Sequence, residues 1–167
     1  MAASPGVLIG PTWSAHLDRW TFDMIDRSVI GAAAFKGVML NIGLTLGAYW
    51  KGLPPSEFLD WFSANNHLIA RTTPLVAPPT LIGLAVSLWL GWSEPTTRYL
   101  WLTSLGLVIG ILIITLAYHL PTNSAFAAKS IPLDQVPAAL NLWLLLHAVR
   151  IALGLVASVV GLVAAAR

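Results

Sequence analysis

Four long apolar stretches constrain the fold of this chain more than any other feature of its sequence. They span about residues 28–50, 72–92, 98–120 and 140–166. A helix of about 20 apolar residues is long enough to cross the hydrocarbon core of a bilayer. The chain is 57% hydrophobic and only 10% charged, whereas soluble domains are about one-quarter charged. We therefore predict an all-α membrane protein in which residues 28–167 form one domain, a four-transmembrane-helix bundle.

Charge and cysteine content exclude several classes of function. The formal net charge is +2, from 9 basic and 7 acidic residues, which leaves no basic surface able to neutralise a run of phosphates. Nucleic acid is therefore not an expected partner. The chain has no cysteine, which excludes disulfides, zinc–thiolate sites, iron–sulfur clusters and a nucleophilic thiol.

The connections between the predicted spans differ in length. Residues 93–97 join the second and third spans and are too few to form more than an antiparallel hairpin turn. Pro54 and Pro55 precede a predicted short helix, residues 57–71, whose apolar side consists of Phe58, Leu59, Trp61 and Phe62. We expect this helix between spans one and two to lie along the membrane interface.

The connection between the third and fourth spans is predicted to be a loop. It covers residues 121–137 and carries Asn123 and Lys129. Pro132 and Pro137 are expected to interrupt any long helix there. In a four-span bundle, both long connections emerge at the same end.

The N-terminal segment, residues 1–27, has the composition of an amphipathic arm. Trp13 and Trp20 are expected at headgroup level, and the same arm is equally suited to docking on a larger membrane protein complex. Basic residues on the terminal side slightly outnumber those on the opposite side, which favours cytoplasmic termini. The expected location is a multi-pass protein of a bacterial inner membrane.

Small residues recur at four-residue spacing in three of the predicted spans. The pairs are Gly43 with Gly47, Gly106 with Gly110, and Gly154 with Ser158. Such spacing lets helix backbones approach closely in a bilayer. We expect these pairs to mark contacts inside the bundle, and a dimer interface is the alternative.

Among the polar residues within the predicted spans, we single out Lys36, Asn41 and Arg150. A central Arg or Lys costs roughly 2.5–3.5 kcal/mol on insertion scales, so each needs a compensating environment. Arg150 lies about 15 Å into the fourth span, and no Asp or Glu falls inside any span. We expect Arg150 to face a cavity or an anionic ligand, the alternative being loop carbonyls or a lipid phosphate. Lys36 is expected to snorkel to the interface.

Trp143, His147 and Arg150 have the spacing that places residues on one side of a helix. This stripe combines an aromatic ring, an imidazole that can take a proton near neutral pH, and a guanidinium that can stabilise the resulting oxyanion. Asn123 is a candidate to help orient that oxyanion. The alternative for His147 is a hydrogen bond to a neighbouring span. A metal or haem between His119 and His147 is geometrically conceivable, but no acidic ligand supports it and no metal site is predicted.

The second half of the chain carries a recognisable series of residues. Pro121-Thr122-Asn123 is followed by Trp143, then by Leu146-His147, Val149-Arg150 and Leu153-Gly154. This series resembles the anthrone oxygenase-like family of small four-span membrane proteins. The resemblance is most specific over residues 121–154 and looser over the first span and residues 53–62, so it covers about half of the chain.

The resemblance implies an activity. Members from fungal polyketide pathways are associated with oxidation of an anthrone to an anthraquinone by O₂ without metal or flavin, so no cofactor is predicted. Carried over, His147 would remove the acidic ring proton of a hydrophobic polycyclic phenol or ketone, and Arg150 and Asn123 would hold the enolate. Trp143 would stack on the flat ring. Asn41 and His119 are predicted as further substrate-binding residues.

Two other functions stay open at this point. The segment Ser124-Ala125-Phe126 lacks the amides and charges associated with the family there, and the arm that carries Trp13 and Trp20 suits attachment to a larger assembly. The first alternative is therefore a non-catalytic accessory subunit of a membrane protein complex. The second is a quinone- or haem-binding membrane protein in which Arg150 or the histidines contact the bound group.

Overall fold

The computed structural model describes residue 37, residues 39–70 and residues 72–167, and within these ranges all regular structure is helical. The predicted N-terminal arm, Lys36 and the beginning of the first predicted span lie outside the described residues. In chain order the elements are the π-helical segment η1 (Ile42–Leu46), α2 (Gly47–Lys51), α3 (Pro55–Ala70), α4 (Thr72–Leu90), α5 (Pro95–Ile114), the π-helical segment η2 (Thr115–His119), α6 (Leu120–Ala127) and α7 (Val136–Ala165).

Among the described residues, two continuous helical segments are long and apolar enough to cross a membrane. One runs from Pro95 to Ala127 through α5, η2 and α6 and has 33 residues, and the other is α7, with 30 residues. A shorter apolar stretch, Ala77–Leu90, lies in α4. These segments agree with the predicted all-α membrane class.

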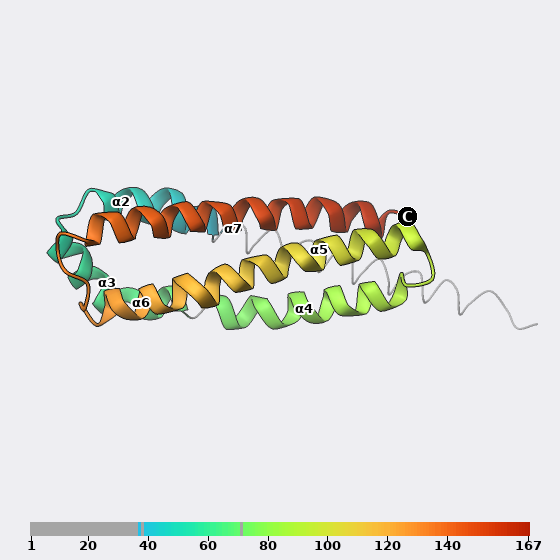
Figure 1. Ribbon diagram of the computed structural model, residues 1–167, viewed down its shortest axis with the longest axis horizontal. Coiled ribbons are helices and arrows are strands. Elements are labelled where there is room, and N and C mark those ends of the chain that lie inside the picture. Colours follow the sequence, from blue (N-terminus) through green and yellow to red (C-terminus); the bar gives the residue numbers. More distant parts are fainter. Residues whose placement is uncertain (1–36, 38, 71) are drawn as a thin grey trace, which may run out of the picture.

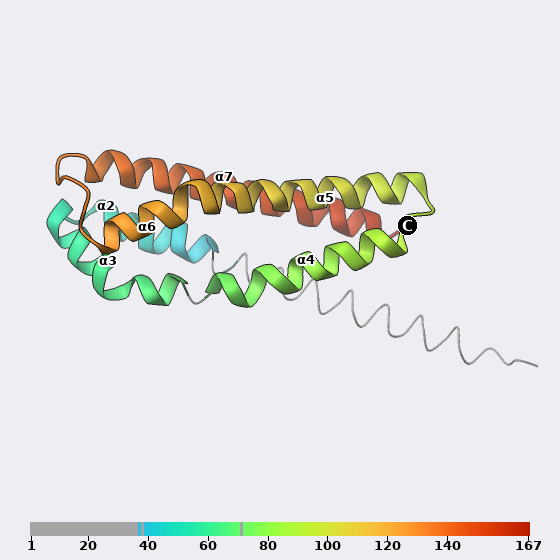
Figure 2. The ribbon, with the colours of Figure 1, turned by 60° about the horizontal axis from the view of Figure 1, so that its bottom comes forward.

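The helices are arranged along one long axis. α5 and α7 lie side by side, and α4 lies along α5 (Figures 1 and 2). Residues 91–94 form the short turn that makes α4 and α5 the predicted antiparallel hairpin. At the other end of the molecule, α2, α3 and α6 gather around the beginning of α7 (Figure 1). We call the end that carries the turn of residues 91–94 the hairpin end, and the end where α2, α3 and α6 surround the beginning of α7 the loop end.

The third predicted span continues further than the sequence analysis expected. α6 extends the helix to Ala127, so the prediction that Pro121 and Asn123 lie in a loop is wrong. Pro121 has no N–H to donate within a helix, but the π-helical segment η2 precedes it, with Leu120 N–H bonded to the Thr115 carbonyl. This wider turn accommodates the proline without ending the helix.

The fourth predicted span begins earlier than expected. Pro137 lies in the first turn of α7, which starts at Val136 rather than near residue 140. A proline is tolerated there because the first N–H groups of a helix have no partner within it. The expectation that Pro137 interrupts the helix is therefore wrong, and the connection is reduced to residues 128–135.

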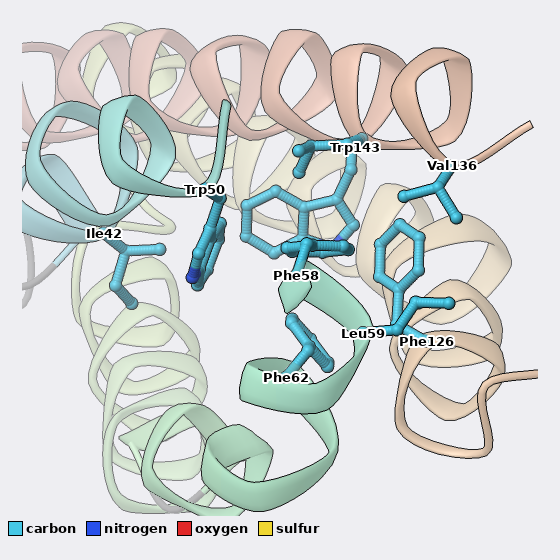
Figure 3. Close-up of a cluster of buried hydrophobic side chains, with 9 residues drawn as sticks. Ile42, Trp50, Phe58, Leu59, Phe62, Phe126, Val136 and Trp143 are labelled. Carbon is cyan, nitrogen blue, oxygen red and sulfur yellow. The ribbon is translucent and has the colours of Figure 1, made fainter. Parts of the chain in front are cut away.

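Aromatic side chains fill the loop end. Trp50, Phe58, Phe62 and Phe126 are each at most 1% exposed, and the Phe126 ring centroid lies 4.9 Å from that of Phe58 and 5.3 Å from that of Phe62 (Figure 3). The short helix α3 exists as predicted, and its Phe58 and Phe62 side chains are buried against α6. The helical course of α6 provides the apolar surface that buries them. The place of α3 along the membrane interface stays a prediction.

Small residues bring α5 and α7 together towards the hairpin end. The buried Ser104 hydroxyl donates to the carbonyl of Ala157 over 2.9 Å. Cβ atoms at Gly110 and Gly154 would contact side chains of the facing helix at 3.8 and 3.6 Å, whereas one at Gly106 would meet nothing within 4 Å. Gly110 and Gly154 therefore lie in contacts inside the bundle, as expected, and Gly106 does not.

Candidate functional site

The predicted stripe on α7 faces the interior of the loop end. Trp143 and His147 are each 2% exposed and Arg150 is 8% exposed. They follow Val136 and Leu140 on the same buried side of the helix. The helical spacing that suggested one shared side is confirmed by this burial.

Trp143 is fixed from two directions. Its indole N–H donates to the side-chain oxygen of Asn123 on α6 over 2.7 Å. Its ring stacks on the His147 ring, with centroids 5.0 Å apart and planes 13° apart. Asn123 therefore does lie beside the stripe, although from a helix instead of the predicted loop. Because His147 already covers Trp143, the indole positions the imidazole, and the predicted role of Trp143 as a stacking surface for a flat ligand has no support here.

The proton on His147 can be placed from its hydrogen bond. Nε2 lies 2.9 Å from the main-chain carbonyl oxygen of Met39, in the helical residues just before η1. A carbonyl oxygen only accepts, so Nε2 carries the hydrogen and Nδ1 keeps a lone pair in the neutral ring. His147 Nδ1 is buried and has no hydrogen-bond partner among the described residues. His147 thus presents a buried basic nitrogen of defined orientation.

Gly43 allows this close approach. A Cβ atom at Gly43 would lie 3.2 Å from Cδ2 and 3.6 Å from Nε2 of His147, and one at Gly47 would lie 2.7 Å from a methyl of Leu144. Both glycines face α7, which fits the predicted close helix contact. The backbone of the first helix can reach His147 because no side chain stands between them.

His119 completes a ring cluster with Trp143 and His147. It is 1% exposed, and its ring centroid lies 4.8 Å from that of Trp143 and 6.2 Å from that of His147. Its Nδ1 faces the Ile114 carbonyl at 3.4 Å, so Nδ1 donates and Nε2 keeps the lone pair. His119 Nε2 is buried and, within the described part of the chain, has no partner.

Arg150 has no carboxylate partner in the described part of the chain. The acidic residues there, Glu57, Asp60, Glu94 and Asp134, are all exposed, and the one ion pair among the described residues joins Asp60 to Lys129. Arg150 Nε is buried without a hydrogen-bond partner among those residues. The positive charge of Arg150 interacts electrostatically with the imidazoles of His119 and His147. A buried cation and two buried lone pairs therefore share one site.

Asn41 is the predicted site residue that the structure places elsewhere. It is exposed, because two residues after Met39 the helix has turned about 200° away from the side that contacts His147. Asn41 therefore lies outside the buried cluster, and its role in substrate binding stays a prediction. His67 on α3 is also exposed, and no group of three or more potential metal ligands occurs among the described residues.

Two features of the site have little signal in the sequence. The carbonyl that orients His147 belongs to the backbone of Met39, so residue type does not reveal it. Both histidines are associated with π-helical segments: η1 contains Gly43, which contacts the His147 ring, and η2 ends at His119. Such segments are frequent at functional sites, but the hydrophobic and small-residue patterns of the sequence mark neither of them.

A hollow of about 360 Å³ lies next to this cluster at the loop end. Its wall is mainly apolar and includes Trp50, Phe58, Val136 and Leu140. Trp50 contacts Trp143 edge-on, with ring centroids 5.6 Å apart. Two tryptophans therefore stand between the hollow and the imidazoles.

Comparison with known families places the chain. Neither the curated proteins nor the solved structures give a match. The family model described as anthrone oxygenase matches residues 61–160. This range contains His119, Asn123, Trp143, His147 and Arg150 but not Met39, Gly43, Trp50 or Phe58, and it covers more than half of the sequence. An oxygenase-like membrane protein is thus the family-level description, and the chain belongs to the anthrone oxygenase family.

Proposed function

We propose that this chain is a multi-pass membrane oxygenase that uses O₂ to oxidise a hydrophobic polycyclic ketone or phenol of the anthrone class without a bound cofactor. The observation that carries the proposal is the unpartnered Nδ1 of buried His147 beside Arg150, which has no carboxylate partner among the described residues. A base and a cation in one water-poor site suit the removal of a proton from a weak carbon acid.

His147 acts as the general base. An anthrone has an acidic CH₂ group because the resulting carbanion is delocalised onto the ketone oxygen as an enolate. The Met39 carbonyl fixes the Nε2–H of His147, and Trp143 covers one face of the ring, so the lone pair of Nδ1 has a set direction. Positioned proton transfer of this kind contributes about 10²–10⁴-fold to rate.

Arg150 stabilises the enolate. Its guanidinium is buried and lacks a carboxylate partner among the described residues, so an anionic intermediate supplies the charge that the protein does not. Asn123 still has an amide NH₂ group to donate, since its oxygen is the atom that accepts from Trp143. The electron-rich enolate then reacts with O₂.

The hollow beside Trp50 is the route by which a flat apolar substrate approaches. Its volume of about 360 Å³ falls in the range of small-molecule sites, roughly 300–1,000 Å³. Movement of the Trp50 and Trp143 rings would connect it to the imidazoles. The aromatic walls suit a polycyclic ligand.

The membrane arrangement of the proposal has four spans. The segment Pro95–Ala127 and α7 are about 50 Å and 45 Å long at 1.5 Å per residue, which exceeds the roughly 30 Å of a hydrocarbon core. α4 and the first predicted span, residues 28–50, are the other two. The loop end then projects towards one headgroup region, and the termini lie on the other side, in the cytoplasm of a bacterial cell.

Turnover of anthrone in air tests the proposal. The full chain in lipid nanodiscs is expected to form anthraquinone, and His147→Gln is expected to lose about 10²-fold or more of kcat. Tyr118→Phe serves as the control, because it removes only the hydroxyl that donates to the Ala139 carbonyl and keeps the ring that packs edge-on against His119. Equal rates for wild type and His147→Gln would end the assignment of the base.

A further inference from the structure

His119 is a buried ionisable group that has no role in the proposed removal of the first proton by His147. We infer that His119 Nε2 removes the second hydrogen from the same substrate carbon, after O₂ has added, and this inference rests on the proposed oxygenase function. It assigns the two imidazoles to two successive steps on one carbon.

The burial of His119 is the first observation behind this assignment. The ring is 1% exposed, its Nδ1–H points to the Ile114 carbonyl, and its Nε2 has no partner among the described residues. Leaving a buried acceptor unsatisfied costs about 1–3 kcal/mol. Packing alone would be served better by an apolar side chain of the same size, so the retained lone pair points to a chemical task.

The second observation is that His119 repeats the arrangement of His147. In each ring one nitrogen donates to a main-chain carbonyl, and the other nitrogen is left as a buried base. The two rings come from η2 and α7 and both contact Trp143, with centroids 6.2 Å apart. Groups on one small aromatic substrate can reach both rings at this separation.

The reaction requires two such bases. In the first step His147 Nδ1 takes one proton from the CH₂ carbon, the carbanion adds O₂, and the peroxide anion regains that proton from His147 to give a hydroperoxide. In the second step His119 Nε2 takes the remaining hydrogen of the carbon as a proton. The C–H electron pair becomes the second bond of the new C=O, the O–O bond breaks, and the leaving hydroxide takes the proton from His119 to form water. The sum is CH₂ plus O₂ giving C=O plus H₂O, with both imidazoles restored.

Two substrates separate these steps. Anthrone itself loses two hydrogens from the reacting carbon, whereas anthrone carrying one methyl group on that carbon has a single hydrogen and stops at the hydroperoxide. With full-length protein in nanodiscs, His119→Gln is expected to take up O₂ with the methylated substrate within about twofold of wild type. With anthrone it is expected to form quinone about 10²-fold more slowly, while hydroperoxide accumulates.

His147→Gln and Tyr118→Phe complete the design. His147→Gln is expected to slow both substrates and to abolish exchange of the CH₂ hydrogens with deuterated water under argon, which His119→Gln retains. Tyr118→Phe, next to His119, is expected to behave as wild type with both substrates. His119→Ala guards against a packing artefact, because added imidazole should restore quinone formation.

Several results would overturn the assignment. If His119→Gln slows the oxidation of both substrates equally, or of neither, His119 has no separate role in the second step. A folded His119→Ala whose quinone formation is not restored by imidazole would contradict that role as well. Wild-type protein that oxidises neither substrate and exchanges no deuterium would instead refute the proposed function, and this inference with it.

Discussion

The loop end and the hairpin end of the molecule are held together in different ways. At the loop end, large rings such as Trp50, Phe126 and Trp143 are buried almost completely. Towards the hairpin end, the buried residues of α5 and α7 are small, namely Ser104, Ala157 and Ala164. The large side chains there, including Leu102, Ile109 and Val159, are exposed.

This difference shows that protein side chains bury one another at the loop end, whereas large side chains towards the hairpin end are left for lipid to cover. Helices in a bilayer gain no hydrophobic energy from hiding leucine or valine from each other, so close backbone contact between small residues holds them together. The loop end instead surrounds polar groups, the two imidazoles and the guanidinium, with packed aromatic rings. The candidate site lies where such a closed interior begins.

Phe126→Ala gives the largest expected effect and tests the contrast directly. Phe126 is fully buried between Phe58 and Phe62, so its removal is expected to destabilise the protein by about 3–5 kcal/mol. The matched change towards the hairpin end is Val159→Ala, on α7 and 61% exposed, with an expected loss within about 0.5 kcal/mol. Unfolding in mixed micelles by added dodecyl sulfate measures both. Equal losses would mean that the two ends are held in the same way.

Gly43→Ala is expected to have an intermediate effect. The added methyl would press on the His147 ring and move it from the Met39 carbonyl, for which overpacking costs of about 1–3 kcal/mol are typical. We expect anthrone turnover to fall about tenfold or more, since 1.4 kcal/mol corresponds to a factor of ten. Gly106→Ala is the control, because a Cβ there meets nothing within 4 Å. A comparable loss of anthrone turnover in both variants would show that the close approach at Gly43 has no particular importance for the site.

Lys129→Met has the smallest expected effect. The ion pair of Lys129 with Asp60 ties the connection after α6 to α3, but the two side chains are 49% and 66% exposed. Exposed ion pairs contribute about 0–1 kcal/mol, so we expect the free energy of unfolding to fall by less than this. Added salt should remove the difference between the variant and the wild type. A loss above about 2 kcal/mol would show that surface charge, as well as aromatic packing, holds the loop end.

Much of this arrangement follows from the sequence. The i, i+4, i+7 spacing of Trp143, His147 and Arg150 predicted a shared buried side, and hydrophobic length predicted the helices that contain them. The resemblance to the anthrone oxygenase family was confirmed by the match over residues 61–160. These features are local or depend on residue type, which is what a single sequence records.

The remaining features depend on partners that spacing does not reveal. Pro121 and Pro137 were expected to interrupt helices, but a preceding π-helical turn accommodates the first and a first-turn position accommodates the second. Asn41 was singled out as a polar residue within a span, but its direction around the helix places it outside the buried cluster. The Met39 carbonyl could not be found at all, since every residue has one.

The hydrogen bond from Ser104 to the Ala157 carbonyl affects the alignment of side chains well away from the bond itself. Ser104 and His119 are carried by one continuous helix, about 22 Å apart along its axis, and Ala157 and Trp143 are separated by nearly the same length on α7. The hydroxyl therefore sets the sliding register of the two helices, and with it which α7 side chain faces His119. A slip of one turn, about 5.4 Å, would carry His119 past Trp143, so a buried serine far from the imidazoles helps to hold both rings against the same indole.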